Sequence, residues 1–462
     1  MRYCLNPQDE GKGRPGLPLK EEALLQFLQG LLLTITAVLS TWLMIMLVYQ
    51  MFLTVFGFKR KTKDYADHDP ASRFLVLVPA HNEEAVIGDM IDNLNRMDYP
   101  RELYDFYIIA DNCTDGTAEK ARSLGAKVIE TRKESPDAPT GKPIALKKAL
   151  EIIGDYDQRY DLMMIFDADN LMDTNMFREV NSQYLDKNKP DFIQCYLGSK
   201  NKSGVVAWFY YTSYTITNRF FQEAKYRLGL NCSIGGTGFA TSTQYLAQRG
   251  GWTTMSLTED FEIQVEATLA GKRILWNHNT RIYDEKPTRI RASLRQKTRW
   301  AQGHWFVALR NTGKVFSALF AKRISLGEAL SLLTYMYSLS TYLIALIQLV
   351  ISLILMLPGF HYQADPPTLS SLLSGLAIFA YSYFMLFYLA DRMDNGIRFH
   401  ICTLPLMIWS VIVNTVIAAL SQLAGLWKHR QQQHWVKTEH SIQRNSAQRA
   451  PMAEDERKAE SI

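Results

Sequence analysis

The chain has 462 residues and a formal net charge of +5, with 47% hydrophobic and 21% charged residues. This length exceeds one ordinary domain and suffices for a soluble domain together with membrane segments. Basic clusters lie beside apolar runs, at 59–63 and from residue 428 onwards, which is typical of membrane-flanking charge rather than of a nucleic-acid-binding protein. The five cysteines lack CxxC or metal-ligand spacing, so no disulfide framework is indicated.

Four stretches without a charged side chain are each long enough to cross a bilayer, which takes about 20 apolar residues. They span residues 23–58, 329–358, 366–390 and 401–427. A buried core helix is the alternative in each case, but core helices rarely run so far without charge. We therefore expect a multi-pass protein of the cell membrane, with one span at 23–58 and three spans within 326–427.

The distribution of basic residues predicts the orientation. Four cations at 59–63 directly follow the first span, whereas the N-terminal segment 1–22 mixes cations with acidic residues. Because cytoplasmic flanks carry the excess of Lys and Arg, residues 59–289 are expected in the cytoplasm. The polar tail at 428–462 is expected to be disordered. Its own cations favour the inside, while three further spans would place it outside, so its side stays open.

Between the first two expected spans, strand and helix patterns alternate at short intervals. Strands are expected at 73–78, 104–110, 127–131 and 162–166, and helices at 83–96, 115–124 and 143–153. This alternation predicts an α/β domain with a mostly parallel sheet and helices on both faces. In such sheets the ligand lies beyond the carboxyl ends of the strands.

Two later stretches combine aromatic and basic side chains. One spans 207–226, and the other spans 290–310 within a segment expected to reach residue 325. Both patterns favour amphipathic helices in the membrane interface, where aromatic rings and cations are stabilised. Ordinary packing of these helices on the sheet is the alternative.

Two carboxylates one residue apart follow the expected strand at 162–166. Asp167 and Asp169 at a strand end can hold a hard divalent cation, Mg²⁺ or Mn²⁺, because such ions prefer oxygen ligands and keep positions open for phosphate oxygens. The metal would bridge the diphosphate of a sugar nucleotide and neutralise the charge of the departing nucleotide. A DxD triplet alone is a weak signal, so its companions decide the interpretation.

These companions follow in a set order. The first strand ends at PAHNEE (79–84) and the second at DNCTDG (111–116), and both loops offer groups that can bind a base and ribose. A glycine and Lys142 open a helix, where a lysine can contact a diphosphate. The loop GGTG (235–238) lets a ligand approach the backbone closely. The later motifs are TED at 258–260 and QKTRW at 296–300.

The order PxxNEE, DxxTDG, GK, DAD, TED and QxxRW resembles that of the family 2 glycosyltransferases with a GT-A fold. More narrowly, it is similar to the membrane-integrated branch that includes cellulose, hyaluronan, chitin-oligosaccharide and poly-N-acetylglucosamine synthases. The similarity covers residues 74–305 and extends to the flanking spans. Six motifs in order at these spacings are far more specific than any one of them. The resemblance implies an inverting enzyme with a UDP-sugar donor, most simply UDP-glucose or UDP-N-acetylglucosamine.

The resemblance also implies roles for single residues. On the donor side the implied contacts are Pro79, Asn82, Glu83 and Asp111 around base and ribose, Asp167 at the ribose edge and the metal, Asp169 at the metal, Lys142 and Arg299 at the diphosphate, and Gln296 beside them. On the acceptor side they are Gly236, Thr237 and Glu259 in the acceptor floor, and Trp300 stacking on the acceptor sugar. Asp260 of the TED triplet would be the general base that deprotonates the acceptor hydroxyl.

Three functions are weighed. The first is a processive polysaccharide synthase that exports its product through its own helices, possible accessory export subunits included. The second is an enzyme that adds one sugar to a lipid-linked acceptor, which product length would distinguish. The third is a non-catalytic membrane receptor or translocation partner with a degenerate transferase domain, which the intact carboxylate set disfavours.

Overall fold

The computed structural model describes residues 19–59, 63–135, 138–357, 360, 369–397 and 401–432. The predictions for 1–22 and for the tail at 428–462 fall mainly outside these residues, as does the start of the span expected at 366–390. Within the described residues, strands and helices alternate after a long first helix.

Eight strands form one mixed sheet in the order β3-β2-β1-β4-β7-β6-β8-β5. Their bounds are β1 Phe74–Ala80, β2 Tyr104–Asp111, β3 Lys127–Thr131, β4 Leu162–Ile165, β5 Leu171–Met172, β6 Phe192–Ser199, β7 Phe239–Ser242 and β8 Ile274–Asp284. The strands β3, β2, β1 and β4 run parallel to one another, and β6 is parallel to β8. The strand β7 is antiparallel to β4 and β6, and β5 is antiparallel to β8. The α/β class is confirmed, and the four strands expected from the sequence form the fully parallel half of the sheet.

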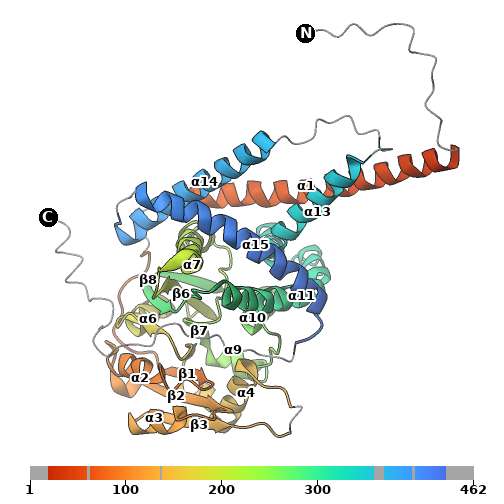
Figure 1. Ribbon diagram of the computed structural model, residues 1–462. Helices are drawn as coiled ribbons and strands as arrows, with labels where there is room; N and C mark the ends of the chain where they lie inside the picture. The colour runs from red at the N-terminus through yellow and green to blue at the C-terminus, as the bar shows by residue number, and fades with distance from the viewer. Residues whose placement is uncertain are drawn as a thin grey trace, which may run out of the picture.

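The helices cover both faces of the sheet and continue into an apolar group. Their bounds are α1 Leu19–Gly57, α2 Ile87–Asn95, α3 Thr117–Ser123, α4 Lys142–Ile153, α5 Tyr156–Arg159, α6 Met176–Asp186, α7 Gly204–Thr217, α8 Ala224–Arg227, α9 Thr243–Gln248, α10 Glu259–Leu269, α11 Ile290–Phe320, α12 Leu326–Met336, α13 Thr341–Leu355, α14 Leu369–Asn395 and α15 Leu404–Lys428. A π-helical segment, η2 (Asn218–Glu223), joins α7 to α8, and short 3₁₀ turns lie at η1 Arg101–Leu103, η3 Ser338–Ser340 and η4 Ile401–Thr403. In Figure 1 the helices α1, α13, α14 and α15 lie together at the top of the molecule, and α2, α3 and α4 lie at the opposite end.

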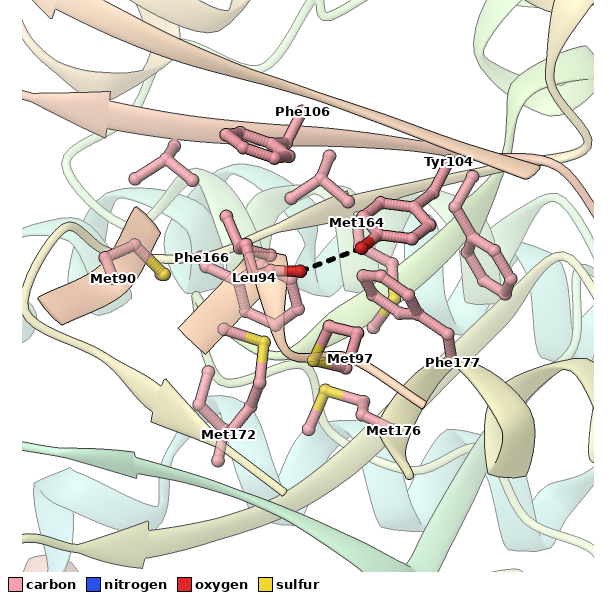
Figure 2. Close-up of a cluster of buried hydrophobic side chains, with 14 of the residues drawn as sticks. Met90, Leu94, Met97, Tyr104, Phe106, Met164, Phe166, Met172, Met176 and Phe177 are labelled. Atoms are coloured by element: carbon pink, nitrogen blue, oxygen red, sulfur yellow. Dashed lines mark hydrogen bonds between the residues drawn. The ribbon is translucent and has the colours of Figure 1, made fainter. Parts of the chain in front are cut away.

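Alternate residues of the strands pack into separate cores on the two faces of the sheet, as a side-chain period of two requires. On one face, Phe74 and Phe166 join side chains of α2 and α6 in a fully buried cluster (Figure 2). There Phe177 stacks on Phe74 with ring centroids 5.0 Å apart. The Tyr104 hydroxyl donates to the Leu94 carbonyl at 2.9 Å, the dashed line in Figure 2. Each buried ring of this size contributes about 1.5–3 kcal/mol. These two cores fix the positions of the strand ends, and the polar loops follow directly from those ends.

Two helices are long and apolar enough to cross a membrane within the described residues, Ala23–Gly57 and Thr403–Lys428. A third span is possible if α12 and α13 are taken together, but these helices are bent by 67° at the turn between them. The continuous span expected at 329–358 is therefore broken. The reason is that α12 packs on α10 and α11, where Leu332 and Met336 are buried with Phe261 and Val307. Hydropathy alone does not detect this packing.

The two aromatic stretches fold as helices, and both lie between the sheet and the apolar helices. In α7 and η2, Tyr211 and Phe220 are buried with Phe387 of α14 and Met407 of α15. Helix α11 packs closely on α15, because a Cβ atom on Gly425 would come within 2.5 Å of the Ala301 Cβ. Their placement in a membrane interface stays a prediction, but they physically join the sheet to the apolar helices.

Candidate functional site

A cavity of about 1300 Å³ lies beyond the carboxyl ends of β1, β2 and β4 and continues between α1, α12, α13 and α14. All but one of the predicted site residues line it: Pro79, Glu83, Asp111, Lys142, Asp167, Asp169, Gly236, Thr237, Glu259, Asp260, Gln296, Arg299 and Trp300. Residues up to 221 positions apart in the chain thus meet in one space. The exception is Asn82.

Asn82 braces two loops instead of lining the cavity. Its backbone has a φ of +56°, and its side-chain oxygen accepts the Thr114 N–H at 2.7 Å. The backbone N–H of Asn82 donates to the Cys113 sulfur at 3.4 Å. Asparagine tolerates the left-handed conformation better than most residues and bonds readily to nearby backbone. Asn82 therefore shapes the pocket wall, and its contact with the nucleotide stays a prediction.

Asp111 ends β2 and is held from several sides. Its Oδ1 accepts the Thr131 hydroxyl at 2.8 Å and the Asn112 amide at 2.7 Å, and His81 Nδ1 lies 2.6 Å from its backbone oxygen. Burial raises the pKa of Asp111, although these hydrogen bonds act in the opposite direction. The result is an immobilised carboxylate, which suits selective hydrogen bonding to a ligand.

Lys142 is the first residue of α4 and joins two parts of the site. Its ammonium donates to Asp167 Oδ1 and to the Gly236 carbonyl, both at 2.6 Å. Burial opposes the charged form, but the carboxylates of Asp167, Glu259 and Asp260 outweigh it and raise the pKa of Lys142. A permanent cation therefore stands at a helix N-terminus among three carboxylates, where it can compensate an anionic ligand.

The DAD turn is held in shape by Asn170 and Thr237. The Asp167 N–H donates to Asn170 Oδ1 at 2.9 Å and to Thr237 Oγ1 at 3.2 Å. The Asp169 carboxylate accepts the Asn170 amide at 3.2 Å and the Glu285 N–H at 3.4 Å. Both carboxylates are thereby directed toward one cavity.

A divalent cation fits this turn only together with other ligands. In the part of the chain that the structure describes, no group of three or more His, Cys, Asp or Glu side chains is arranged to hold a metal ion. Mg²⁺ is commonly bound by one or two protein carboxylates, with substrate phosphates and water as the remaining ligands. Asp167 and Asp169 match that mode, so the donor set fits a cation that binds with a diphosphate.

Glu259 and Asp260 form the first turn of α10. Burial raises the pKa of both carboxylates, and the Asp260 charge raises that of Glu259 further, while Lys142 and Arg299 act in the opposite direction. Gly236 faces Asp260 at close range, because a Cβ there would lie 3.0 Å from Asp260 Oδ2 and its φ is +79°. A carboxylate with a raised pKa binds a proton more strongly than an ordinary one, which suits a general base.

Helix α11 closes the site with the QxxRW motif. Gln296 accepts the Tyr210 hydroxyl at 2.9 Å, and the Trp300 ring lies edge-on to Tyr210 with centroids 6.2 Å apart. One turn later, α11 comes so near the TED loop that a Cβ on Gly303 would lie 2.4 Å from Thr258 Oγ1. The closeness of these two segments brings Arg299 and Asp260 to one cavity.

Sequence reasoning missed Asp284 and Lys286, both of which line the cavity. Lys286 is buried, with its ammonium 2.7 Å from Asp284 Oδ2 and 3.5 Å from the centroid of the Tyr214 ring. Burial, together with the nearby Asp167 charge, raises the pKa of Asp284. The available signal was the polar run DEKP at 284–287, but its strand, β8, was not predicted, so the run had no position in the sheet.

The chain matches the family model described as glycosyltransferase like family 2 over residues 70–303, a region that contains every motif above. The chain belongs to this family. The predicted recognition is confirmed, the protein is a glycosyltransferase, and the non-catalytic alternative is not supported. The carboxylate set described above lies within the matched region.

Several relatives of this glycosyltransferase have names that state an activity. The probable glycosyltransferase YdaM of Bacillus subtilis is 25% identical over 293 residues, which cover 61% of this chain and 68% of that protein. Beta-monoglucosyldiacylglycerol synthase of a Nostoc species is 26% identical, covering 51% of each chain. Poly-beta-1,6-N-acetyl-D-glucosamine synthase of Staphylococcus epidermidis is 22% identical, covering 64% and 70%. The chain thus spans about half the length of the glucosyldiacylglycerol synthase, and its relatives include polysaccharide and glycolipid synthases.

Among solved structures, the mannosyltransferase of Pyrobaculum calidifontis, determined in complex with GDP-Man and Mn²⁺, superposes with a TM-score of 0.54 at 18% identity. The match covers 83% of this chain and 98% of that chain. At this identity the likeness concerns the fold. The GT-A fold expected for this glycosyltransferase is confirmed.

Proposed function

We propose that this glycosyltransferase transfers a sugar from a UDP-sugar to the end of a growing polysaccharide, with inversion, and that the product passes between its own membrane helices. The observation that supports this most is the continuity of the cavity. The space that contains Asp167 and Asp260 also reaches α1, α13 and α14. The catalytic domain would face the cytoplasm of a multi-pass membrane protein, and accessory export subunits would act beyond the helices.

The donor side of the proposal rests on the arrangement of charge. Asp111 would bind the base or ribose, and Lys142 and Arg299 would face the diphosphate, with UDP-glucose or UDP-N-acetylglucosamine as the leading donors. Asp167 and Asp169 would hold Mg²⁺ or Mn²⁺, which when bound neutralises negative charge on the diphosphate. The Mn²⁺ complex of the fold neighbour agrees with this cofactor.

The chemical step needs one base. Asp260 would accept the proton of the acceptor hydroxyl as its oxygen forms a bond to the anomeric carbon of the donor sugar. The bond from that carbon to the diphosphate oxygen breaks, and UDP leaves with the electron pair. The cations Lys142 and Arg299 line the same cavity, and in this proposal they face the oxygen on which the charge develops and so stabilise the transition state.

The membrane side of the cavity offers hydroxyl groups and aromatic rings, which suit a carbohydrate. Its lining there includes Tyr214, Tyr335, Tyr342, Tyr383, Thr217, Ser338, Thr341 and Ser382. Ring faces can stack on sugar rings while hydroxyls replace hydrogen bonds to water. This composition favours passage of a glycan.

The product distinguishes the two acceptor classes. Membranes containing the full chain, given radiolabelled UDP-glucose or UDP-N-acetylglucosamine and Mn²⁺, are expected to make polymer that stays near the origin of a gel and is cut by linkage-specific glycosidases. Membranes lacking the protein are the control. A product longer by one sugar that extracts into organic solvent would contradict the polysaccharide proposal.

That second outcome has support of its own. Leu43, Leu47 and Met51 of α1 line the far end of the cavity with apolar surface, which suits a lipid chain. One of the relatives, the beta-monoglucosyldiacylglycerol synthase, is named for a glycolipid. A single addition to a lipid-linked acceptor is therefore the second candidate.

The pH dependence of transfer should report Asp260. Because burial raises the pKa of Asp260, this base becomes protonated at higher pH than an ordinary aspartate, whose pKa is about 3.9. We expect kcat/KM to fall as pH is lowered, along an acid limb displaced upward from that value. Burial and the Asp260 charge raise the pKa of Glu259 to about 7, so Glu259 is already uncharged where Asp260 titrates, and Glu259→Gln should leave this limb in place. An acid limb at the ordinary aspartate position in both proteins would contradict the assignment.

A further inference from the structure

A buried lysine lies in the membrane side of the cavity, apart from the carboxylates. Lys225 belongs to α8, is 4% exposed and lines the cavity. The helix α8 packs on α1, where Ala224 is buried with Tyr49 and Leu53. Lys225 therefore sits at the junction between the catalytic domain and the first membrane helix.

Two uncharged side chains, Ser233 and Tyr335, lie beside the Lys225 ammonium. Ser233 Oγ lies 3.3 Å from Nζ, and the centroid of the Tyr335 ring lies 5.1 Å away. In the described residues no carboxylate oxygen comes within the 4.0 Å that defines an ion pair with it. Glu328 acts on Lys225 only at longer range, and its Oε1 already accepts the Asn231 N–H at 2.8 Å.

This arrangement is costly for structure alone. Burial lowers the pKa of Lys225, because an ammonium without a close anion is poorly solvated. A methionine would fill the same space against Tyr335 without that penalty. A cation retained here, beside the cavity, is explained by an anionic group that occupies the cavity.

The same end of the cavity has apolar walls and an open side. Leu47 and Met51 of α1 line it, although they are 52% and 62% exposed. Ala345 of α13 and Leu386 of α14 line it as well. Residues that are exposed on a membrane helix and also line the cavity place its opening toward the bilayer. A buried cation beside an apolar opening is complementary to an amphiphile with an anionic head group.

We propose that this end of the cavity binds a phospholipid, with its phosphate on Lys225 and an acyl chain along Leu47 and Met51. Cationic pockets between membrane helices on the cytoplasmic side bind anionic lipid headgroups in this way. The inference rests on the membrane location in the proposed function, and it makes no use of the donor or the base.

The test is a binding measurement on the purified full chain in neutral detergent, without donor. The probes are a short-chain phosphatidic acid, the diacylglycerol with the same chains, and inorganic phosphate. Phosphatidic acid should bind at least about tenfold more tightly than either part alone, and Lys225→Met should weaken it about tenfold or more, as loss of a charged hydrogen bond predicts. Leu47→Asp should also weaken the binding of phosphatidic acid, because it places a charge along the proposed path of the acyl chain.

A matched control is Lys297→Met. Lys297 is also a desolvated lysine, 2.8 Å from Asn414 Oδ1, but it is absent from the cavity lining. Its variant should bind phosphatidic acid like the unaltered protein. Equal binding by Lys225→Met, equally tight binding of inorganic phosphate, or Lys225-dependent binding of an acidic oligosaccharide in place of the lipid would each overturn the proposal. Because no sugar transfer is measured, failure here is distinguishable from failure of the proposed function.

Discussion

Asp260→Asn is expected to lower kcat for sugar transfer by about 10²–10⁴-fold while UDP binding stays nearly unchanged. The amide keeps the size of the carboxylate but cannot accept the proton of the acceptor hydroxyl. Asp260 lies at the start of α10, in the cavity that also holds Lys142 and Arg299. Because the latter two cations are proposed to carry the diphosphate, nucleotide binding does not depend on the base.

The measurement pairs a transfer assay with UDP titration by calorimetry on the full chain. Glu266→Gln is the matched control, since Glu266 lies on the same helix but pairs with Arg249 outside the cavity lining. Glu266→Gln should retain transfer. If Asp260→Asn keeps more than about one tenth of the activity, the base is another group, because the lower limit of general-base catalysis is about 100-fold.

Asp169→Asn is expected to reduce transfer by about 10²–10³-fold, because a bound metal supplies several kcal/mol of charge stabilisation. An amide oxygen carries no net charge and is a weaker ligand for Mg²⁺ or Mn²⁺. The neighbouring hydrogen bonds from Asn170 and Glu285 reach the carboxylate oxygens, and one of them can persist in the variant. The fold should therefore survive the change.

Mn²⁺ binding in the presence of UDP, followed by electron paramagnetic resonance, gives a readout apart from activity. Asp169→Asn should weaken it, and a chelator should abolish transfer by the unaltered protein. Asp92→Asn is the control, since Asp92 is an exposed carboxylate that pairs with Arg96 on α2. Unaltered Mn²⁺ affinity in Asp169→Asn would remove Asp169 from the metal site.

The sequence was most informative where structure depends on neighbours in the chain. The strands β1 to β4 follow from compact apolar runs, and each motif loop lies at the strand end where the pattern placed it. The strands β5 to β8 were not predicted, although β6 and β8 have eight and eleven residues. β5 has only two residues, and β7 lies antiparallel between β4 and β6, far from both in the chain. Pairing partners of that kind are chosen across the fold and not by local spacing.

The long apolar helices likewise differ in how far the sequence alone predicts them. Apolar length alone identified α1 and α15. It did not separate α12 from α13, because burial of Leu332 against the catalytic domain and exposure to lipid both call for apolar residues. The hydrogen bond by which Asn82 joins the two loops could not be predicted either. A motif gives the residue type, but it does not give the direction of the side-chain amide.

By itself the sequence determined the family, the α/β order, two candidate membrane helices and the chemical types at the site, because these depend on residue type and spacing. The tertiary structure decided which side chains share a space. It brought Asp284 and Lys286 to the carboxylates, placed Lys225 at the membrane end, and joined both regions in one cavity. Such convergence depends on packing between segments that are distant in the chain, and no local pattern encodes it.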